Sequence, residues 1–284
     1  MTTALLRPAG WPAPLLSPAE VQQAAGILVE RRRRGLAAAV LPAACRPTTL
    51  TDAFAVQQAV AAQAGLLSSG AQSSGAQSAS TVCGWKCGLS SVDGEGQLKI
   101  VAAPLYQAEL SQGECCVLWP SSTQRARVEP EYAYPLQQAL AAGQQYSDAE
   151  LLAALGRPRL ALELIASRYA TDSGAGYLDQ LADGLFNQGL WLGPELQQPA
   201  AAAFVLQVRM PDQALLWAAR HPNGDPQAPL LPFIRLLHSC GIDLAAGQLL
   251  ITGSFAGVLE LPLATPLTLQ FGAEPALTLQ FSAR

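Results

Sequence analysis

Three glutamates in two extended stretches are the residues best suited to carry chemistry. Glu129 and Glu131 lie two positions apart in VEPEYAY (128–134), and Glu163 lies in the apolar stretch LALELIA (160–166). Side chains alternate between the faces of a strand, so Glu129 and Glu131 share one face. Oxygen-only ligation suits magnesium, manganese or calcium better than zinc. The three carboxylates, if they converge, therefore suggest a hard divalent metal ion.

The spacing of Glu129 and Glu131 alone also fits a solvated edge strand with an acidic outer face. Glu163 favours the metal site over this alternative, because the residues around it leave no solvated face and predict a buried strand. A carboxylate buried without a partner would be neutralised, since burial disfavours its charged form. One metal ion would explain all three glutamates.

Lys86 lies in the apolar stretch CGWKCGLSS (83–91), with a glycine two positions away on each side that would allow close approach of a ligand. Most lysines in strands are solvated residues of an edge strand, so a functional role for Lys86 depends on further evidence. We interpret Cys83 and Cys87 as thiols of the core rather than as metal ligands.

Composition and charge exclude several classes of protein. The 284 residues are 50% hydrophobic and carry a net charge of −4, and the one dense basic run, residues 31–34, suits the C-terminal end of a helix better than a nucleic acid. We expect neither an export signal nor a membrane partner. The six scattered cysteines predict reduced thiols and a cytoplasmic location. Serine hydrolases and nucleotide-dependent enzymes are disfavoured, because their sequence motifs are missing.

The chain divides into a helical N-terminal part (1–67), a flexible low-complexity loop (68–80) and a β-rich catalytic domain (81–284). A capping box at Ser17 and Glu20 predicts a helix over 18–34, and a second helix is expected over 51–64. The tandem repeat SSGAQ at 68–77 offers no apolar face, which predicts a mobile and dispensable segment.

Short β-like runs follow, and they predict an α+β fold rather than a doubly wound sheet. Helical signals interrupt them only at 147–150, near 177–186 and between 226 and 240. The runs 267–271 and 277–281 predict a hairpin that closes the sheet. The other predicted strands cover 82–88, 115–119, 126–134, 159–167, 203–209, 213–219 and 248–253.

Several segments, taken in order, resemble the fumarylacetoacetate hydrolase superfamily. Within it, they resemble the branch of the 2-keto-4-pentenoate hydratases and 4-oxalocrotonate decarboxylases. The matching segments are DAFAVQ (52–57), GWKCGLSS (84–91), VEPE (128–131), LELIASR (162–168), HP (221–222) and LAAGQLLITGS (244–254). The ordered set is specific, although each segment alone is not.

The resemblance implies a mixed β-roll or barrel-like core with an N-terminal helical part, and a homo-oligomer. It also implies that the three glutamates hold Mg²⁺ or Mn²⁺ and that Lys86 is the active-site lysine. Leu89, Thr252 and Ser254 would then lie beside the substrate.

The implied substrate is a small 2-oxo or 2-hydroxydienoic acid from aromatic-compound catabolism. A hydratase would add water to give a 4-hydroxy-2-oxo acid, whereas a decarboxylase of the 4-oxalocrotonate type would release carbon dioxide. Ala166, where a small residue resembles the hydratases, slightly favours hydration. Residues 103–106 and 183–186 depart from the family pattern, which would reshape the pocket. A non-catalytic binding or scaffold subunit stays open, although idle sites gain no stability from buried like charges.

Overall fold

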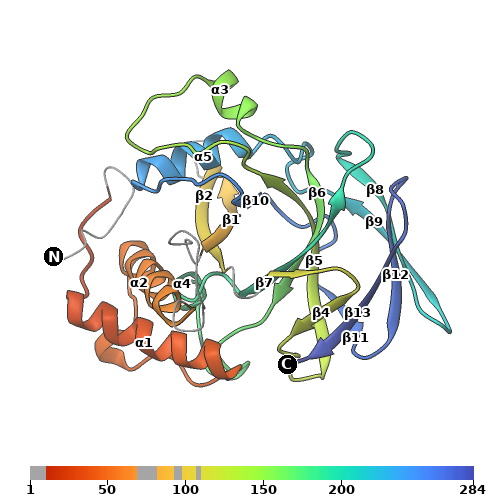
Figure 1. Ribbon diagram of the computed structural model, residues 1–284. Helices are drawn as coiled ribbons and strands as arrows, with labels where there is room; N and C mark the ends of the chain where they lie inside the picture. The colour runs from red at the N-terminus through yellow and green to blue at the C-terminus, as the bar shows by residue number, and fades with distance from the viewer. Residues whose placement is uncertain (1–10, 69–81, 93–97, 107–109) are drawn as a thin grey trace, which may run out of the picture.

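The computed structural model describes residues 11–68, 82–92, 98–106 and 110–284 (Figure 1). The predicted mobile loop at 68–80 lies outside these residues, apart from Ser68 at the end of a helix. Two long N-terminal helices and one short later helix lie together on one side of the molecule, two further helices lie along another edge, and two β-sheets form the remainder. The α+β class predicted from the sequence is confirmed.

Two long helices begin the described chain, α1 (Pro18–Arg34) and α2 (Leu50–Ser68). Ser17 and Glu20 form the predicted capping box, and Gly35 ends α1 in a left-handed conformation. Both helices share an apolar core with α4 (Tyr177–Ala182). The helical N-terminal part therefore packs directly on elements that come much later in the chain.

The larger sheet has eight strands in the order β2-β1-β10-β5-β6-β7-β3, with β11 paired to β5. It is mixed, because β1 pairs parallel to β10 and β3 parallel to β7, while the other pairs are antiparallel. The sheet curves until β2 approaches β7, so it encloses an interior (Figure 1). Its strands are β1 (Val82–Val92), β2 (Leu98–Tyr106), β3 (Leu110–Gln112), β5 (Arg125–Pro135), β6 (Arg159–Ile165), β7 (Asn187–Glu195), β10 (Leu249–Ile251) and β11 (Leu259–Pro262).

The second sheet has five strands in the order β4-β13-β12-β8-β9. Its strands are β4 (Cys115–Leu118), β8 (Ala203–Arg209), β9 (Ala214–Arg220), β12 (Pro266–Phe271) and β13 (Leu277–Ala283). β12 and β13 form the predicted hairpin. The prediction that this hairpin closes the main sheet is wrong, because β12 pairs with β8 and β13 with β4.

Three further short helices are α3 (Asp148–Ala153), α5 (Leu230–Ser239) and the 3₁₀ helix η1 (Ala43–Cys45). The strands β2, β3, β7 and β11 were not predicted. The first seven residues of β7 are all buried, so the strand lacks the polar and apolar alternation that marks a half-exposed strand. None of the described helices combines the length and apolar character needed to cross a membrane.

Candidate metal centre

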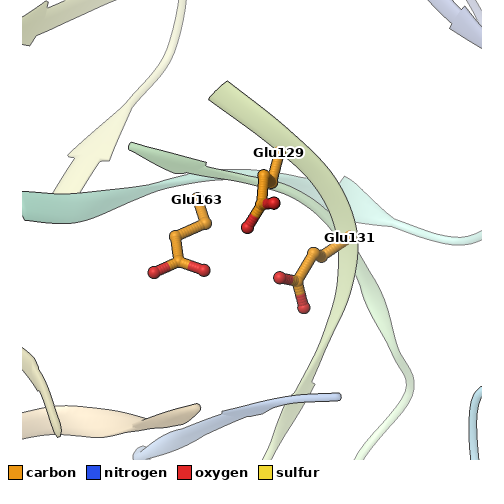
Figure 2. Close-up of side chains that lie close together, drawn as sticks. All are labelled: Glu129, Glu131 and Glu163. Atoms are coloured by element: carbon orange, nitrogen blue, oxygen red, sulfur yellow. The ribbon is translucent and has the colours of Figure 1, made fainter. Parts of the chain in front are cut away.

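The antiparallel pairing of β5 and β6 brings the three glutamates together. Glu129 lies directly opposite Glu163, and Glu131 lies two residues further along the same face. One carboxylate oxygen from each lies within 4.8 Å of the others, and Figure 2 shows the three groups turned toward one space. Like charges directly opposite one another destabilise a sheet. Folding alone would therefore not favour this arrangement.

Burial makes Glu129 and Glu131 hard to ionise. Glu163 is fully buried and Glu131 is 2% exposed, whereas Glu129 is half-buried. Burial, followed by the charges of Glu163 and Glu129, raises the pKa of Glu131 well above its usual value, although the Gly253 N–H donates to its Oε2 at 2.9 Å. Burial and the charge of Glu163 raise the pKa of Glu129 to about 7. A bound cation would oppose these effects.

Lys86 faces the glutamates from β1. Its Nζ donates to both oxygens of Glu163 at 2.7 Å and to the Leu185 carbonyl at 3.1 Å. Burial acts to lower the pKa of Lys86, but the charges of Glu163, Glu129 and Glu131 outweigh burial, so the pKa is raised. The lysine is therefore an ammonium at neutral pH.

Charge and donor type together fit a divalent cation. Three carboxylates face one ammonium, so the ionised cluster carries two uncompensated negative charges. All three candidate ligands are carboxylate oxygens, which Mg²⁺, Mn²⁺ and Ca²⁺ prefer. Oε1 of Glu163 accepts from both Lys86 and Asn187, whereas Oε2 accepts from Lys86 and keeps a second lone pair that can bind a metal. The residues present therefore fit a hard divalent ion.

Gly84 sets the position of β1 and thereby of Lys86. A Cβ at Gly84 would lie only 2.1 Å from the carbonyl oxygen of Leu249 on β10. The glycine thus allows β1 to pair closely with β10, which places Lys86 beside Ile251. Gly84 serves the packing of two strands rather than the approach of a ligand.

A cavity of about 320 Å³ opens onto Glu129 and Glu131. Lys86, Glu129 and Glu131 form its charged end, and Arg127 also lines it. The apolar wall contains Ile165 and Phe186. The cavity therefore combines a charged end with an apolar wall, as small-molecule sites commonly do.

The residues expected beside a substrate lie in different surroundings. Ser254 lines the cavity. Thr252 is buried, and its hydroxyl donates to the Pro226 carbonyl at 2.8 Å and lies 3.4 Å from Nε2 of His221. The side chain of Leu89 lies outside the described part of the chain, although its backbone pairs with Ile100.

Sequence reasoning missed two residues near the glutamates. Asn187 donates from its side-chain amide to Oε1 of Glu163 at 2.9 Å, and no local pattern in the sequence marks this residue. Arg127 precedes Glu129 by two positions and lies on the same face of β5, so the alternation of the strand could have revealed it. Its Nε lies 3.7 Å from Oε1 of Glu260.

No protein-family model matches the sequence, and no curated protein matches it significantly. Solved structures do resemble the fold. One is 4-oxalocrotonate decarboxylase from Pseudomonas putida G7 complexed with magnesium and adipate, with a TM-score of 0.71 and 16% identity. The same enzyme complexed with calcium and acetate gives a TM-score of 0.70 and 16% identity. Each alignment covers 94% of this chain and 99% of the other.

The likeness extends over nearly the whole length of both chains and includes both the curved sheet and the N-terminal helices. At this level of identity, it establishes a common fold. The metals in the two solved structures are of the oxygen-preferring kind that the three glutamates suit. The chain therefore has the fold of the fumarylacetoacetate hydrolase superfamily, as the ordered motifs of its sequence predict.

Proposed function

We propose that this chain is a divalent-metal-dependent hydratase that adds water to a 2-hydroxy-2,4-dienoate to give a 4-hydroxy-2-oxo acid. The observation that carries the proposal is the convergence of Glu129, Glu131 and Glu163 within 4.8 Å of one another beside the ammonium of Lys86. A buried cluster of like charges has no evident role in stability, and the adjoining cavity can admit a small molecule.

Glu129, Glu131 and Glu163 would hold Mg²⁺ or Mn²⁺, which when bound supplies a Lewis acid for the carboxylate and the adjacent oxygen of the substrate. Lys86 places a fixed positive charge beside the same space, where it stabilises negative charge that develops on the substrate oxygen. Its ammonium can also donate a proton as the enol becomes a ketone. Water then adds across the remaining double bond as a hydroxyl group and a proton.

The apolar wall of the cavity suits the carbon chain of a dienoate. Ile165 and Phe186 line it, together with Val258. Apolar surface packs against an uncharged carbon chain, whereas the charged residues of the cavity suit the polar end of the molecule. The wall therefore supports a substrate with one polar end and an unsaturated tail.

Decarboxylation of a dicarboxylic acid is the second candidate, and Arg127 favours it. A guanidinium in the cavity could bind a second carboxylate, because its planar fork matches that group. The two solved structures described above are of 4-oxalocrotonate decarboxylase, one of them complexed with the dicarboxylate adipate. Either reaction uses the same three glutamates and Lys86.

Metal analysis of the purified protein, followed by an ultraviolet assay, tests the proposal. We expect bound Mg²⁺ or Mn²⁺ and a metal-dependent loss of absorbance of a conjugated 2-hydroxydienoate without release of carbon dioxide. Release of carbon dioxide from an oxo-hexenedioate instead would favour the decarboxylase. Bound metal with neither reaction would indicate the non-catalytic subunit.

We also propose that the chain forms a homo-oligomer in the cytoplasm. Val205 on β8 and Leu216 on β9 are 56% and 63% exposed, and such neighbouring apolar side chains support an interface. All six cysteines are free thiols, which supports a reducing compartment. Sedimentation at micromolar concentration tests the assembly, and a strictly monomeric species would contradict it.

A further inference from the structure

A tight turn next to Glu163, formed by residues 183–187, joins α4 to β7. We name it the 183–187 turn. Every carbonyl of this turn accepts a hydrogen bond, so its backbone is fully engaged. The carbonyls of Asp183 and Asn187 each accept from Arg32 and Arg168. The Gly184 carbonyl accepts from the Asn187 N–H, the Leu185 carbonyl from Lys86, and the Phe186 carbonyl from the Ala166 N–H.

The backbone of the turn adopts an unusual conformation. Gly184, Leu185 and Phe186 have φ values of 84°, 52° and 67°, so three successive residues are left-handed. This conformation suits glycine but is disfavoured for bulky residues such as leucine and phenylalanine. Such strain persists only where the surrounding structure holds the backbone in place, and it gathers at functional sites.

Two buried arginines hold the turn through its backbone carbonyls. Arg32 of α1 and Arg168 after β6 each donate from Nη2 to the Asn187 carbonyl at 2.8 Å. Nε of Arg168 also donates to both carboxylate oxygens of Asp183, at 2.9 and 2.7 Å. Arg32 is 7% exposed and Arg168 is 3% exposed. The carbonyls at the C-terminal end of α4 attract these positive charges.

Asn187 connects the arginines to the candidate metal centre. Its carbonyl receives the two guanidinium groups, while its Nδ2 donates to Oε1 of Glu163 at 2.9 Å and to the Gly189 carbonyl at 3.2 Å. Hydrogen bonds of this kind fix the orientation of a metal-binding side chain and tune its affinity for the ion. Asn187 is completely buried, so water does not compete for these contacts.

We propose that Asn187 is a positioning residue for Glu163, and that Arg32 acts through Asn187, so that helix α1 contributes to metal binding. This inference rests on the proposed metal site. The alternative is that Arg32 only anchors α1 to the rest of the fold. That alternative predicts a loss of thermal stability without a change in the affinity of the folded protein for metal.

Binding of Mn²⁺ to the full chain, measured by the electron paramagnetic resonance signal of the free ion, tests the proposal without any assay of turnover. We expect Asn187→Leu, which removes the amide at similar size, to weaken Mn²⁺ binding about 10- to 100-fold. Arg32→Met should weaken it about threefold to tenfold, because the Asn187 carbonyl keeps its contact with Arg168. Arg32→Lys retains a donor and should restore part of the loss.

The double variant Arg32→Met, Asn187→Leu provides the sharpest comparison. If Arg32 acts through Asn187, the double variant binds Mn²⁺ no more weakly than Asn187→Leu alone. The matched control is Arg33→Met on the same helix, whose exposed side chain pairs only at the surface with Glu30. This control should bind Mn²⁺ like the wild type.

Several outcomes would overturn the inference. Unchanged Mn²⁺ affinity in folded Asn187→Leu would remove Asn187 from its positioning role, and additive losses in the double variant would separate Arg32 from Asn187. A lowered melting temperature with full Mn²⁺ affinity in Arg32→Met would leave Arg32 as an anchor only. If Asn187→Leu does not fold, Asn187→Ser takes its place. Absence of Mn²⁺ binding in the wild type would instead overturn the proposed function itself.

Discussion

The two sheets of this molecule follow different rules of burial. In the five-stranded sheet, β12 buries every second residue, namely Leu267, Leu269 and Phe271, as expected for a half-exposed strand. In the eight-stranded sheet, β6 buries six residues in succession, and one of them is Glu163. The strands of the five-stranded sheet all lie in the described part of the chain, and none of them buries a charged side chain.

The five-stranded sheet mainly stabilises the fold, whereas the eight-stranded sheet holds the charged residues of the candidate metal centre. Apolar residues on one face of the five-stranded sheet stabilise the protein by burial and need no partner. Glu131, Glu163 and Lys86 in the larger sheet cost stability unless a partner compensates their charges. Changes in the two sheets should therefore affect different measurable properties.

The largest expected effect comes from Glu163→Gln. The substitution keeps the size of the side chain but removes the charge that pairs with Lys86 and that, in the proposed site, would bind the metal, so turnover should fall about a thousandfold or more. Metal affinity, measured by calorimetry, should fall with it. The matched control is Thr278→Glu, which adds a carboxylate to an exposed position of β13 and should leave metal affinity unchanged. Full metal binding by Glu163→Gln would contradict the assigned site.

Lys86→Met should lower turnover by roughly two to three orders of magnitude, the scale of one lost electrostatic donor. The lysine contacts Glu163 but offers no ligand to a cation, so metal content should remain close to that of the wild type. Activity and metal content are measured on the same preparation. Full activity would exclude Lys86 from catalysis, whereas loss of metal together with turnover would assign it a role in forming the site.

Val208→Ala in β8 tests the five-stranded sheet. Val208 is fully buried, and removal of its two methyl groups should lower the free energy of unfolding by about 2 kcal/mol through lost burial and a small cavity. Chemical denaturation measures this loss. Turnover per folded molecule should be unchanged, and a large change in turnover would show that the two sheets are not independent.

The smallest expected effect is the dependence of metal affinity on pH. The pKa of Glu129 is about 7, raised from 4.5, so its contribution to the stability of the metal-free protein is complete below pH 4.5 and is lost as pH rises through 7. Metal binding needs the ionised carboxylate and releases its proton. Affinity measured by calorimetry should therefore increase by at least about tenfold from pH 6 to pH 8, because Glu131, whose pKa is also raised, must lose its proton too. An affinity that is constant over this range would show that Glu129 binds no metal.

The sequence predicted the helices and strands that are determined by residues close together in the chain. The capping box of α1, the alternation in β5 and the hairpin of β12 and β13 each depend on residues close together in the chain, and each is found in the structure. β7 escaped prediction because its sequence NQGLWLGPE contains two glycines and a proline, which are typical of turns, beside only a short apolar run. The assignment of the hairpin to the main sheet failed because strand partners are set by contacts between distant segments.

The residues of the candidate site also divide into those that a short stretch of sequence reveals and those that it does not. The shared face of Glu129 and Glu131 follows from the geometry of one strand. The position of Glu163 opposite Glu129 depends on the register of β5 and β6, which neither segment encodes alone. Asn187 could not be found from the sequence, because its contact with Glu163 requires the left-handed turn that precedes β7.

The position of β13 has a consequence for the order of folding. β13 lies between β12, its neighbour in sequence, and β4, with which it pairs in parallel although residues 115–118 are far away along the chain. The hairpin of β12 and β13 can form early from nearby residues, whereas the pairing with β4 requires closure of a long loop and is slow. Until that step, both β4 and one side of β13 expose unpaired backbone groups that can pair with other chains. Aggregation during refolding should therefore depend on how rapidly β13 reaches β4, and substitutions that strengthen this one pairing should improve the yield of native protein.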